Sequence, residues 1–341
     1  MVTSRAAGHK AVKTALSRLD DRRLAELVGQ ARPLGSGIGG TSALLDVEGV
    51  RVFVKRVPLT DLERLPGRLG STANVFGLPV CYQYGIGSAG FGAWRELAAH
   101  VLTTDWVLGG HSPSFPLLHQ WRVLPRTATT EPGPGEPAEL ERAVAFWDGS
   151  PAVRARLEAV ANASADVVLF LEYVPWSLHD WLAAQVALGD EAVEAACALV
   201  GRELGAAVSA MGAGGLHHFD VHFRNVLTDG EHLYVGDFGL AVSPRFALSR
   251  EELGFLAANA THDRHYAAAQ WVNWLVTALC RPPERNEFIR YCAEGGDPGY
   301  LVPSAAAAIR RHARETVVVN DFYRRLYLES RGTPYPAELL S

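Results

Sequence analysis

The sequence predicts an α+β fold with two lobes, strand-rich in its first half and helix-rich in its second. Short runs of β-branched and aromatic residues recur as far as about residue 174, and an Ala-rich helical pattern dominates the chain beyond that point. The 341 residues allow about two domains at roughly 150 residues each, and a hydrophobic content of 48% suffices for a sizeable core.

The first lobe is expected over residues 31–173, after an N-terminal amphipathic helix over residues 1–30. The apolar residues of that helix recur at close to helical spacing: Val12, Leu16, Leu19, Leu24 and Leu27. Two β-like runs, SALLDV and VRVFVKRV, are joined at Glu48-Gly49 and follow the run GSGIGG. This pattern predicts a glycine-rich turn that leads into a β-hairpin.

Two insertions are expected in the first lobe, near residues 58–92 and 126–161. The first contains Gly, Pro and Ser with weak periodicity, around a short strand expected at LPVCYQY. The second is the Pro/Gly/Thr-rich loop PRTATTEPGPGEP followed by a helical pattern over 137–161. A helix is expected from Gly92 to Trp106, and strands are expected at FPLLHQWRVLP and DVVLFLEYV.

The second lobe, residues 174–341, is expected to be helical. It begins with SLHDWLAAQVA and continues with a long helix over 190–211 that ends in a group of glycines. Two short strand-like runs, NVL and LYVG, follow around the turn TDGE. Further helices are expected from about Ser249 and over 262–279, and the C-terminal segment is rich in arginine.

Composition narrows the function classes. The 32 basic residues against 37 acidic ones give a net charge of −5, which provides no electrostatic footprint for nucleic acid or an anionic membrane. The four cysteines show neither CxxC spacing nor the density of a disulfide scaffold, which favours reduced thiols. No stretch resembles a secretory signal or the ~20 apolar residues of a membrane span. We therefore expect a cytoplasmic protein.

The segment HFDVHFRNVLTDGEHLYVGDFGLA, residues 218–241, contains the most informative chemistry. Asp220, Asn225 and Asp237 lie within 18 positions, at the two ends of a tight hairpin. Two carboxylates and one amide are hard oxygen ligands, and ends of a hairpin can converge on one point. This pattern suits Mg²⁺, which takes a few such oxygens and leaves its other positions for phosphate and water.

These residues also resemble a known family. HFDVHFRN matches the H-x-D-x-x-x-x-N catalytic loop of protein kinases, and Asp237-Phe238-Gly239 matches their DFG. Over roughly residues 30–280 the sequence resembles the protein-kinase-like superfamily, as an atypical bacterial kinase between Ser/Thr protein kinases and aminoglycoside/choline-type phosphotransferases. The resemblance implies a bilobal protein-kinase-like fold that transfers the γ-phosphoryl group of ATP to a hydroxyl, with Mg²⁺.

The glycines and one lysine extend the resemblance. Gly35, Gly37 and Gly40 form G-x-G-x-x-G ahead of a strand, where the backbone can approach nucleotide phosphates. Lys55 follows in VFVK, like the lysine of V-A-I-K, where a fixed cation neutralises phosphate oxygens.

The resemblance further assigns roles to the remaining site residues. Asp220 would orient the acceptor hydroxyl and accept its proton, and Asn225 and Asp237 would hold Mg²⁺. Backbone groups of Glu172 and Val174 would bind the adenine edge of ATP.

The family's lysine pairs with a glutamate, for which Glu96 in a helix is the first choice and Glu63 the second. Glu96 lies 41 residues after Lys55, a longer separation than is usual in the family, so residues 58–92 would be an insertion. Simpler structural explanations stay open: an i,i+4 interaction of Glu96 with His100, and a surface position for Lys55.

Two other kinds of site also stay open. Gly85, Gly87 and Gly90 make a second G-x-G-x-x-G between an expected strand and a helix, which is the context of a dinucleotide-binding turn. His218 and Asp220 with a later histidine make the ligand pattern of a 2-His-1-carboxylate iron site. The later histidines are His262, His265 and His312.

Departures from the family bear on the acceptor. Phe219 replaces the Arg of H-R-D, His222 gives the D-x-H of aminoglycoside and choline-type kinases, and no A-P-E follows DFG. These features slightly favour a small-molecule hydroxyl over a protein Ser/Thr. A non-catalytic nucleotide-binding pseudokinase or regulatory module is the rival of another class. Asp263 either braces the catalytic loop or caps a helix.

Overall fold

The computed structural model describes residues 2–37, 39–126 and 137–340. Helices make up 51% of the described residues and strands 15%, which confirms the α+β prediction. The chain forms two compact units. The first consists of Met1–Tyr173 with Asp237–Glu252, and the second of Val174–Gly236 with Leu253–Ser341.

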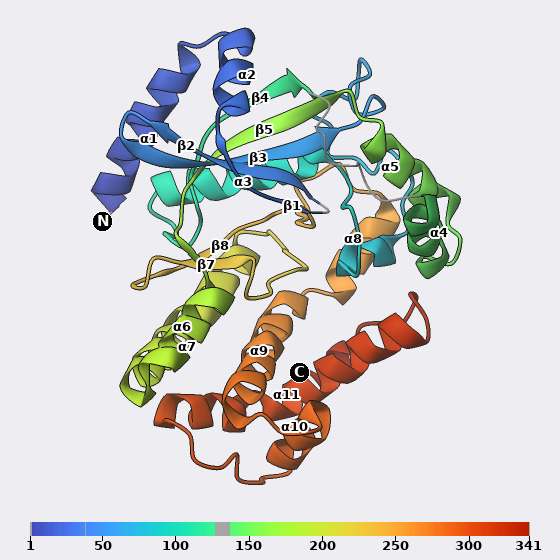
Figure 1. Ribbon diagram of the computed structural model, residues 1–341. Helices are drawn as coiled ribbons and strands as arrows, with labels where there is room; N and C mark the ends of the chain where they lie inside the picture. The colour runs from blue at the N-terminus through green and yellow to red at the C-terminus, as the bar shows by residue number, and fades with distance from the viewer. Residues whose placement is uncertain (1, 38, 127–136, 341) are drawn as a thin grey trace. The chain divides into compact units, whose positions relative to one another are not determined.

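The first unit contains a five-stranded antiparallel sheet in the order β1-β2-β3-β5-β4 (Figure 1). Its strands are β1 (Arg32–Gly37), β2 (Gly40–Val47), β3 (Val50–Leu59), β4 (Leu118–Pro125) and β5 (Ala165–Glu172). The predicted hairpin is β2-β3, whose two turn residues Glu48 and Gly49 both have positive φ, as a tight hairpin turn requires.

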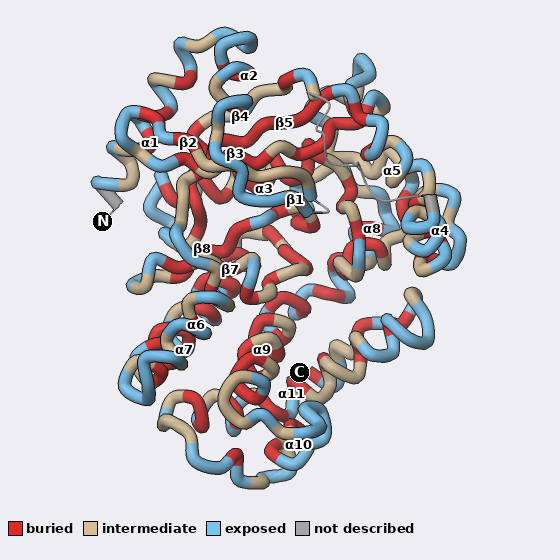
Figure 2. The backbone as a smooth tube through the Cα atoms, in the orientation of Figure 1, coloured by how far each residue is buried: buried red, intermediate tan, exposed pale blue. Residues whose placement is uncertain are grey.

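Helices cover both faces of this sheet, and the sheet lies between them as a buried layer (Figure 2). They are α1 (Val2–Ser17), α2 (Asp21–Gly29) and α3 (Ala93–Leu108). Side chains alternate along β5: Val168 and Phe170 pack with α1 and α2, whereas Val167 and Leu169 pack with α3. The two-residue period of a strand therefore decides which residues of this sheet meet α3.

Two sequence predictions for this unit are wrong. The described part of residues 1–30 forms two helices, because Asp20 adopts an extended conformation and caps α2 by accepting the Arg23 N–H. LPVCYQY forms the 3₁₀ helix η1 (Val80–Tyr84) and not a strand. Its buried Tyr82 and Tyr84 are held by tertiary packing and not by a strand ladder.

The two predicted insertions pack against each other. The second contains α4 (Pro137–Phe146) and α5 (Pro151–Ala161), while most of its Pro/Gly/Thr-rich loop lies outside the described residues. A separate buried cluster joins them, in which the rings of Tyr82 and Trp147 lie 4.7 Å apart. Arg156 of α5 forms a buried ion pair with Glu63 at 3.0 Å.

The second unit is mainly helical, as predicted, with a small β6-β7-β8 sheet. Its elements are β6 (Trp176–Ser177), α6 (Leu178–Leu188), α7 (Asp190–Ala213), β7 (Val226–Thr228), β8 (Leu233–Val235), α9 (His262–Leu275), the π-helical η2 (Val276–Cys280), α10 (Arg285–Ala293), α11 (Pro303–Leu328) and the 3₁₀ helix η3 (Ala337–Leu339). The helix α8 (Arg250–Ala258) runs across the last boundary between the units. Helices α7, α9 and α11 pack together.

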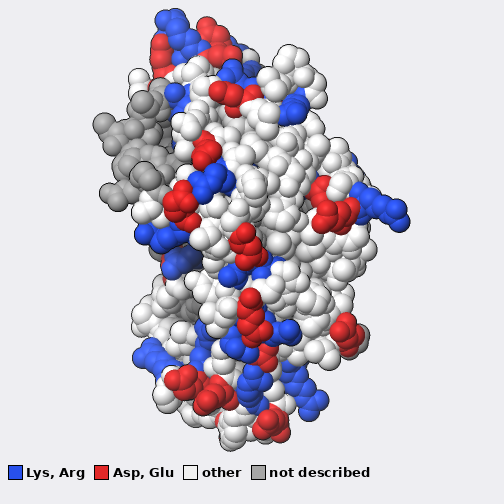
Figure 3. All heavy atoms as spheres, turned by 90° about the vertical axis from the view of Figure 1, so that its right-hand side faces the viewer, with Lys and Arg blue, Asp and Glu red and all other residues white. Residues whose placement is uncertain are grey.

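On the face shown in Figure 3, acidic and basic side chains are interspersed. Within the described residues, no helix combines the length and the apolar character needed to cross a membrane. All four cysteines are free thiols.

Candidate functional site

Lys55 reaches the site because of its position on β3. Val52 and Val54 pack with α1 and α2, so positions 53, 55 and 57 lie on the opposite face of the sheet, toward α3. Val57 packs with α3 residues accordingly, and Lys55 lies on the same face. The lysine is only 8% exposed, so its charge needs a partner inside the unit.

Two carboxylates supply that partner. The Nζ atom of Lys55 lies 2.7 Å from Glu96 Oε1 and 2.7 Å from Asp237 Oδ1. Burial alone would lower the pKa of Lys55, but the charges of Asp237 and Glu96 outweigh it and raise this pKa above its ordinary value. Lys55 is therefore a fixed cation and not a surface lysine.

Glu96, the first choice from the sequence, is the glutamate that pairs with Lys55. His100 Nε2 lies 4.0 Å from Glu96 Oε1, so the i,i+4 contact is longer than the lysine pair. The second choice, Glu63, supports the helix that bears Glu96: its carboxylate accepts the N–H of Ala93, the first residue of α3, at 2.9 Å. Nothing in the sequence near Glu63 predicts this long-range cap.

The glycine-rich turn lies beside Lys55. A side chain at Gly39 would place its Cβ 3.3 Å from Lys55 Nζ. The sequence motif pointed to Gly35, Gly37 and Gly40 and did not identify Gly39 as the glycine nearest the lysine. Gly40 has φ +122°, and a Cβ there would overlap the carbonyl oxygen of Arg56, so only glycine fits. A Cβ on Gly35 or Gly37 would meet nothing within 4 Å, so open space borders the turn.

Asp237 is held by the residue that follows it. It has φ +58°, a left-handed conformation that costs a non-glycine residue energy. Phe238 is fully buried, and its ring lies 4.8 Å from that of His100 and 6.3 Å from that of Phe115. The buried ring fixes the backbone that presents the Asp237 carboxylate to Lys55.

The first insertion packs on the chain after Asp237. Gln83 donates a hydrogen bond to the carbonyl oxygen of Leu240. Gly90 lies so close to the Gly239 carbonyl that a Cβ at position 90 would overlap it. Thr72 Oγ1 accepts the N–H of Ala247 at 2.8 Å.

The end of the same segment is tied to α3. Arg95, next to Glu96, forms a buried ion pair with Glu252 at 2.5 Å. The whole segment Asp237–Glu252 is therefore anchored within the first unit, by the insertion and by the helix that bears Glu96.

The two residues predicted to bind adenine lie on opposite sides of the boundary between the units, which falls after Tyr173. The Glu172 N–H donates to Leu117 O at 2.8 Å, so only the carbonyl oxygen of Glu172 could take the predicted role. The Glu172 carboxylate binds both Nε and Nη2 of Arg5, at 2.8 and 2.7 Å. Arg5 of α1 is thus paired with the last residue of β5 through two charge-assisted hydrogen bonds.

In the second unit, Asp263 holds the loop that contains Asp220. Its carboxylate accepts the backbone N–H groups of His218 at 2.6 Å and Phe219 at 2.8 Å. Phe219 has φ +63° and is fully buried, and its ring stacks on His262 at 4.8 Å. The sequence left open whether Asp263 braces this loop or caps a helix, and its contacts show that it braces the loop. Burial raises the pKa of Asp263, but the hydrogen bonds from the His262 side chain and the His218 backbone outweigh burial and lower it.

His218 and Asn225 complete this loop. The His218 Nδ1 atom accepts the Asp220 N–H at 3.2 Å, so Nε2 carries the proton and donates to Gly236 O at 2.8 Å. Asn225 Nδ2 donates to Asp220 O and Oδ2, at 3.0 and 3.1 Å. The amide orientation leaves Asn225 Oδ1 as the oxygen that could face a cation.

The rival sites do not match this geometry. Both ring nitrogens of His218 and of His262 form hydrogen bonds inside the protein, which disfavours them as iron ligands. The 3₁₀ helix η1, and not a strand, ends immediately before Gly85, so the second glycine motif lacks the setting of a dinucleotide-binding turn. Among the described residues, no group of three or more His, Cys, Asp or Glu side chains is arranged to hold a metal ion.

Neither the protein-family models nor the curated proteins gave a match to this chain.

Proposed function

We propose that the chain is an ATP-dependent phosphotransferase of the protein-kinase-like type, whose two units act as the two lobes of a kinase. The observation that supports this most strongly is the buried triplet in the first unit: Lys55 Nζ lies 2.7 Å from both Glu96 and Asp237, beside the glycine-rich turn. A purely structural ion pair needs neither a third charged group nor open space next to a tight glycine turn.

Each residue of the triplet has a distinct task in this proposal. Lys55 neutralises phosphate oxygens of ATP, and Glu96 fixes the direction of the lysine side chain. Backbone N–H groups near Gly35 and Gly37 approach the phosphates where side chains would interfere. Positioning and charge neutralisation supply most of the reduction in barrier height.

The donor set also fits Mg²⁺. Asp237 offers a half-exposed carboxylate, and Asn225 offers an amide oxygen, both of which are hard ligands. When bound, the ion would neutralise charge on the transferred group. Asp220 orients the acceptor hydroxyl and accepts its proton, with its own side chain fixed by Asn225 Nδ2 at 3.1 Å.

The acceptor is a hydroxyl-bearing compound, and a small molecule is favoured over a protein Ser/Thr. Residues Asp237–Glu252 are bound to the first unit through Gln83, Thr72 and Arg95 and so are not available as a separate peptide-docking platform. His222 Nε2 lies 3.7 Å from Asp220 Oδ2, near the group that meets the acceptor.

Labelled ATP tests the proposal. The protein is incubated with γ-labelled ATP and Mg²⁺, first alone and then with cell extract separated into protein and low-mass fractions. We expect label in the low-mass fraction, lost in Asp237→Ala. Label in the protein fraction would instead identify a Ser/Thr protein kinase. ATP binding without any transfer would support the non-catalytic module, and absence of ATP binding would contradict the proposal.

A further inference from the structure

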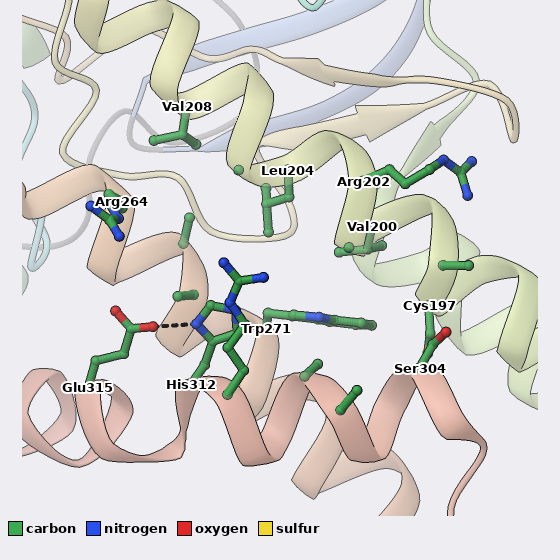
Figure 4. Close-up of a pocket in the computed structure, with 18 of the residues that line it drawn as sticks. Cys197, Val200, Arg202, Leu204, Val208, Arg264, Trp271, Ser304, His312 and Glu315 are labelled. Carbon is green, nitrogen blue, oxygen red and sulfur yellow. Dashed lines mark hydrogen bonds and ion pairs between the residues drawn. The ribbon is translucent and has the colours of Figure 1, made fainter.

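The second unit contains a cavity of about 850 Å³ between α7, α9 and α11, lined by none of the residues assigned to phosphoryl transfer (Figure 4). Trp271 of α9, only 3% exposed, contributes one wall, and its indole lies between α7 and α11. The cavity thus belongs to one compact unit.

Small residues keep this cavity open. Gly201 and Gly205 lie one turn apart inside α7, and a Cβ at either would meet nothing within 4 Å. A glycine inside a helix costs roughly 1 kcal/mol relative to alanine, and the packing of these helices does not require either one. The facing positions on the other two helices are also small: Ala267, Ala268, Ala307 and Ala308.

The lining carries an excess of positive charge. Arg202, Arg264 and Arg311 line the cavity, one from each helix, against a single acidic residue, Glu315. Within the described parts of the chain, none of these arginines forms an ion pair, although the protein as a whole has a net charge of −5. In Figure 4 Arg202 points away from Trp271, which makes it a rim residue.

The one acidic residue of the lining, Glu315, is bound by two histidines. The Glu315 carboxylate bonds His265 Nδ1 at 2.5 Å and also bonds His312 Nδ1 (Figure 4). Burial opposes its ionisation, but the hydrogen bonds from the two histidines lower the pKa of Glu315 to about 2. The two histidines thus occupy both oxygens of this carboxylate, Oε2 and Oε1, which leaves the arginines of the lining for a ligand.

We propose that this cavity binds a small anionic molecule that has a phosphate or carboxylate group attached to a flat apolar part. Arg264 and Arg311 bind the anion, and the apolar part packs on Trp271 and the alanines. This site is separate from the ATP and acceptor sites of the proposed function.

Isothermal titration with three naphthalene probes tests the proposal. We expect 1-naphthyl phosphate or 1-naphthoate to bind one per chain, with an affinity that falls as salt is added. The neutral 1-naphthol should bind at least tenfold more weakly. The stronger of the two anions identifies whether phosphate or carboxylate is preferred, and failure of both anions to bind would overturn the proposal.

Variants locate the bound probe. Arg311→Gln should weaken binding at least tenfold, whereas Arg310→Gln, on the same helix but outside the cavity lining, should not. Gly205→Leu should abolish binding by filling the cavity, and circular dichroism checks that α7 persists, since leucine is the better helix former. Equal binding by the two arginine variants would overturn the proposal even if Gly205→Leu fails to fold.

A further control separates this inference from the proposed function. Lys55→Met, which removes the cation of the candidate nucleotide site, should leave binding of the preferred anion unchanged. Loss of binding in Lys55→Met but not in Arg311→Gln would place the anion at the nucleotide site and would contradict the cavity assignment.

Discussion

The residues proposed for phosphoryl transfer are held in different ways in the two units. Lys55, Glu96 and Asp237 come from three separate parts of the first unit and are joined by charge. Asp220 and Asn225 come from one loop of the second unit, whose shape is set by hydrogen bonds to its backbone. Removing one charge should therefore disturb the Lys55–Glu96–Asp237 cluster most. Removing one hydrogen-bond acceptor of its backbone N–H groups should disturb the Asp220 loop most.

The largest effect is expected when the lysine is removed. Lys55→Met should reduce transfer by at least about 100-fold, because the phosphates lose their fixed cation. It should also lower the free energy of unfolding by roughly 3 kcal/mol, since Glu96, 2% exposed, keeps a buried charge without its cation. Kinetic assays and denaturant titration measure the two effects.

A second substitution separates these two effects. Lys55→Met with Glu96→Gln removes both charges, so it should recover most of the stability and none of the transfer. If the double variant regained transfer, or if Lys55→Met alone were as stable as the wild type, the charge account of the first unit would be wrong.

The next largest effect concerns the brace of the loop. Asp263→Asn leaves one of the His218 and Phe219 N–H groups without an acceptor, so the free energy of unfolding should fall by roughly 2 kcal/mol. Transfer should fall about tenfold in kcat with KM little changed. The control is Asp229→Asn. The carboxylate of Asp229 also accepts two backbone N–H groups, but it lies at the hairpin turn. This variant should leave kcat unchanged, and equal losses in kcat would refute the brace.

A smaller effect is expected from a pair of glycines in the first insertion. Gly87 and Gly90 have nearly the same φ, +69° and +67°, so alanine adds similar backbone strain at both. Only at Gly90 does the new Cβ overlap the carbonyl of Gly239. Gly90→Ala should therefore lower Tm and transfer more than Gly87→Ala, and equal effects would mean that the insertion does not fix the segment after Asp237.

The smallest effect is a difference in acid sensitivity between the units. In the first unit, burial and the neighbouring His9 lower the pKa of His119 to about 4, so the folded state binds fewer protons than the unfolded chain. Its stabilising contribution is complete above the ordinary pKa of 6.5 and is lost as pH falls from 6.5 to 4. In the second unit, the contribution of Glu315 is lost only between about pH 4.5 and pH 2.

Substitutions test this ordering by thermal denaturation across pH. His119→Gln should flatten the dependence of Tm on pH between 6.5 and 4, and Glu315→Gln should flatten it between 4.5 and 2. The opposite assignment of the two pH windows would contradict the ordering.

The two regions also differ in how far the sequence predicts them. The loop around Asp220 is local: its motif, from His218 to Asn225, spans eight positions and follows a strongly periodic helix, so its place in the helical half of the chain is predictable. The Lys55–Glu96 pair is not local, because 41 residues separate the two. The helix around Glu96 can be predicted, but only the sheet topology shows that it covers the face on which Lys55 lies.

The two wrong predictions have different causes. LPVCYQY is apolar enough to read as a strand, but Tyr82 packs on Trp147, 65 positions later, and the segment forms a 3₁₀ helix. The break at Asp20 has a local cause, because an aspartate that caps a helix is recognisable from sequence. Distant packing partners, and not missing motifs, limit the prediction of the insertion.

The central claim is that one chain both binds ATP and transfers its phosphoryl group. Parallel measurement of Mg²⁺-dependent ATP binding and of label transfer, in the wild type and in Asp220→Ala, tests it most directly. We predict that Asp220→Ala binds ATP with unchanged affinity and transfers no label, because Asp220 acts on the acceptor and not on the nucleotide. Transfer by Asp220→Ala at the wild-type rate would contradict the claim.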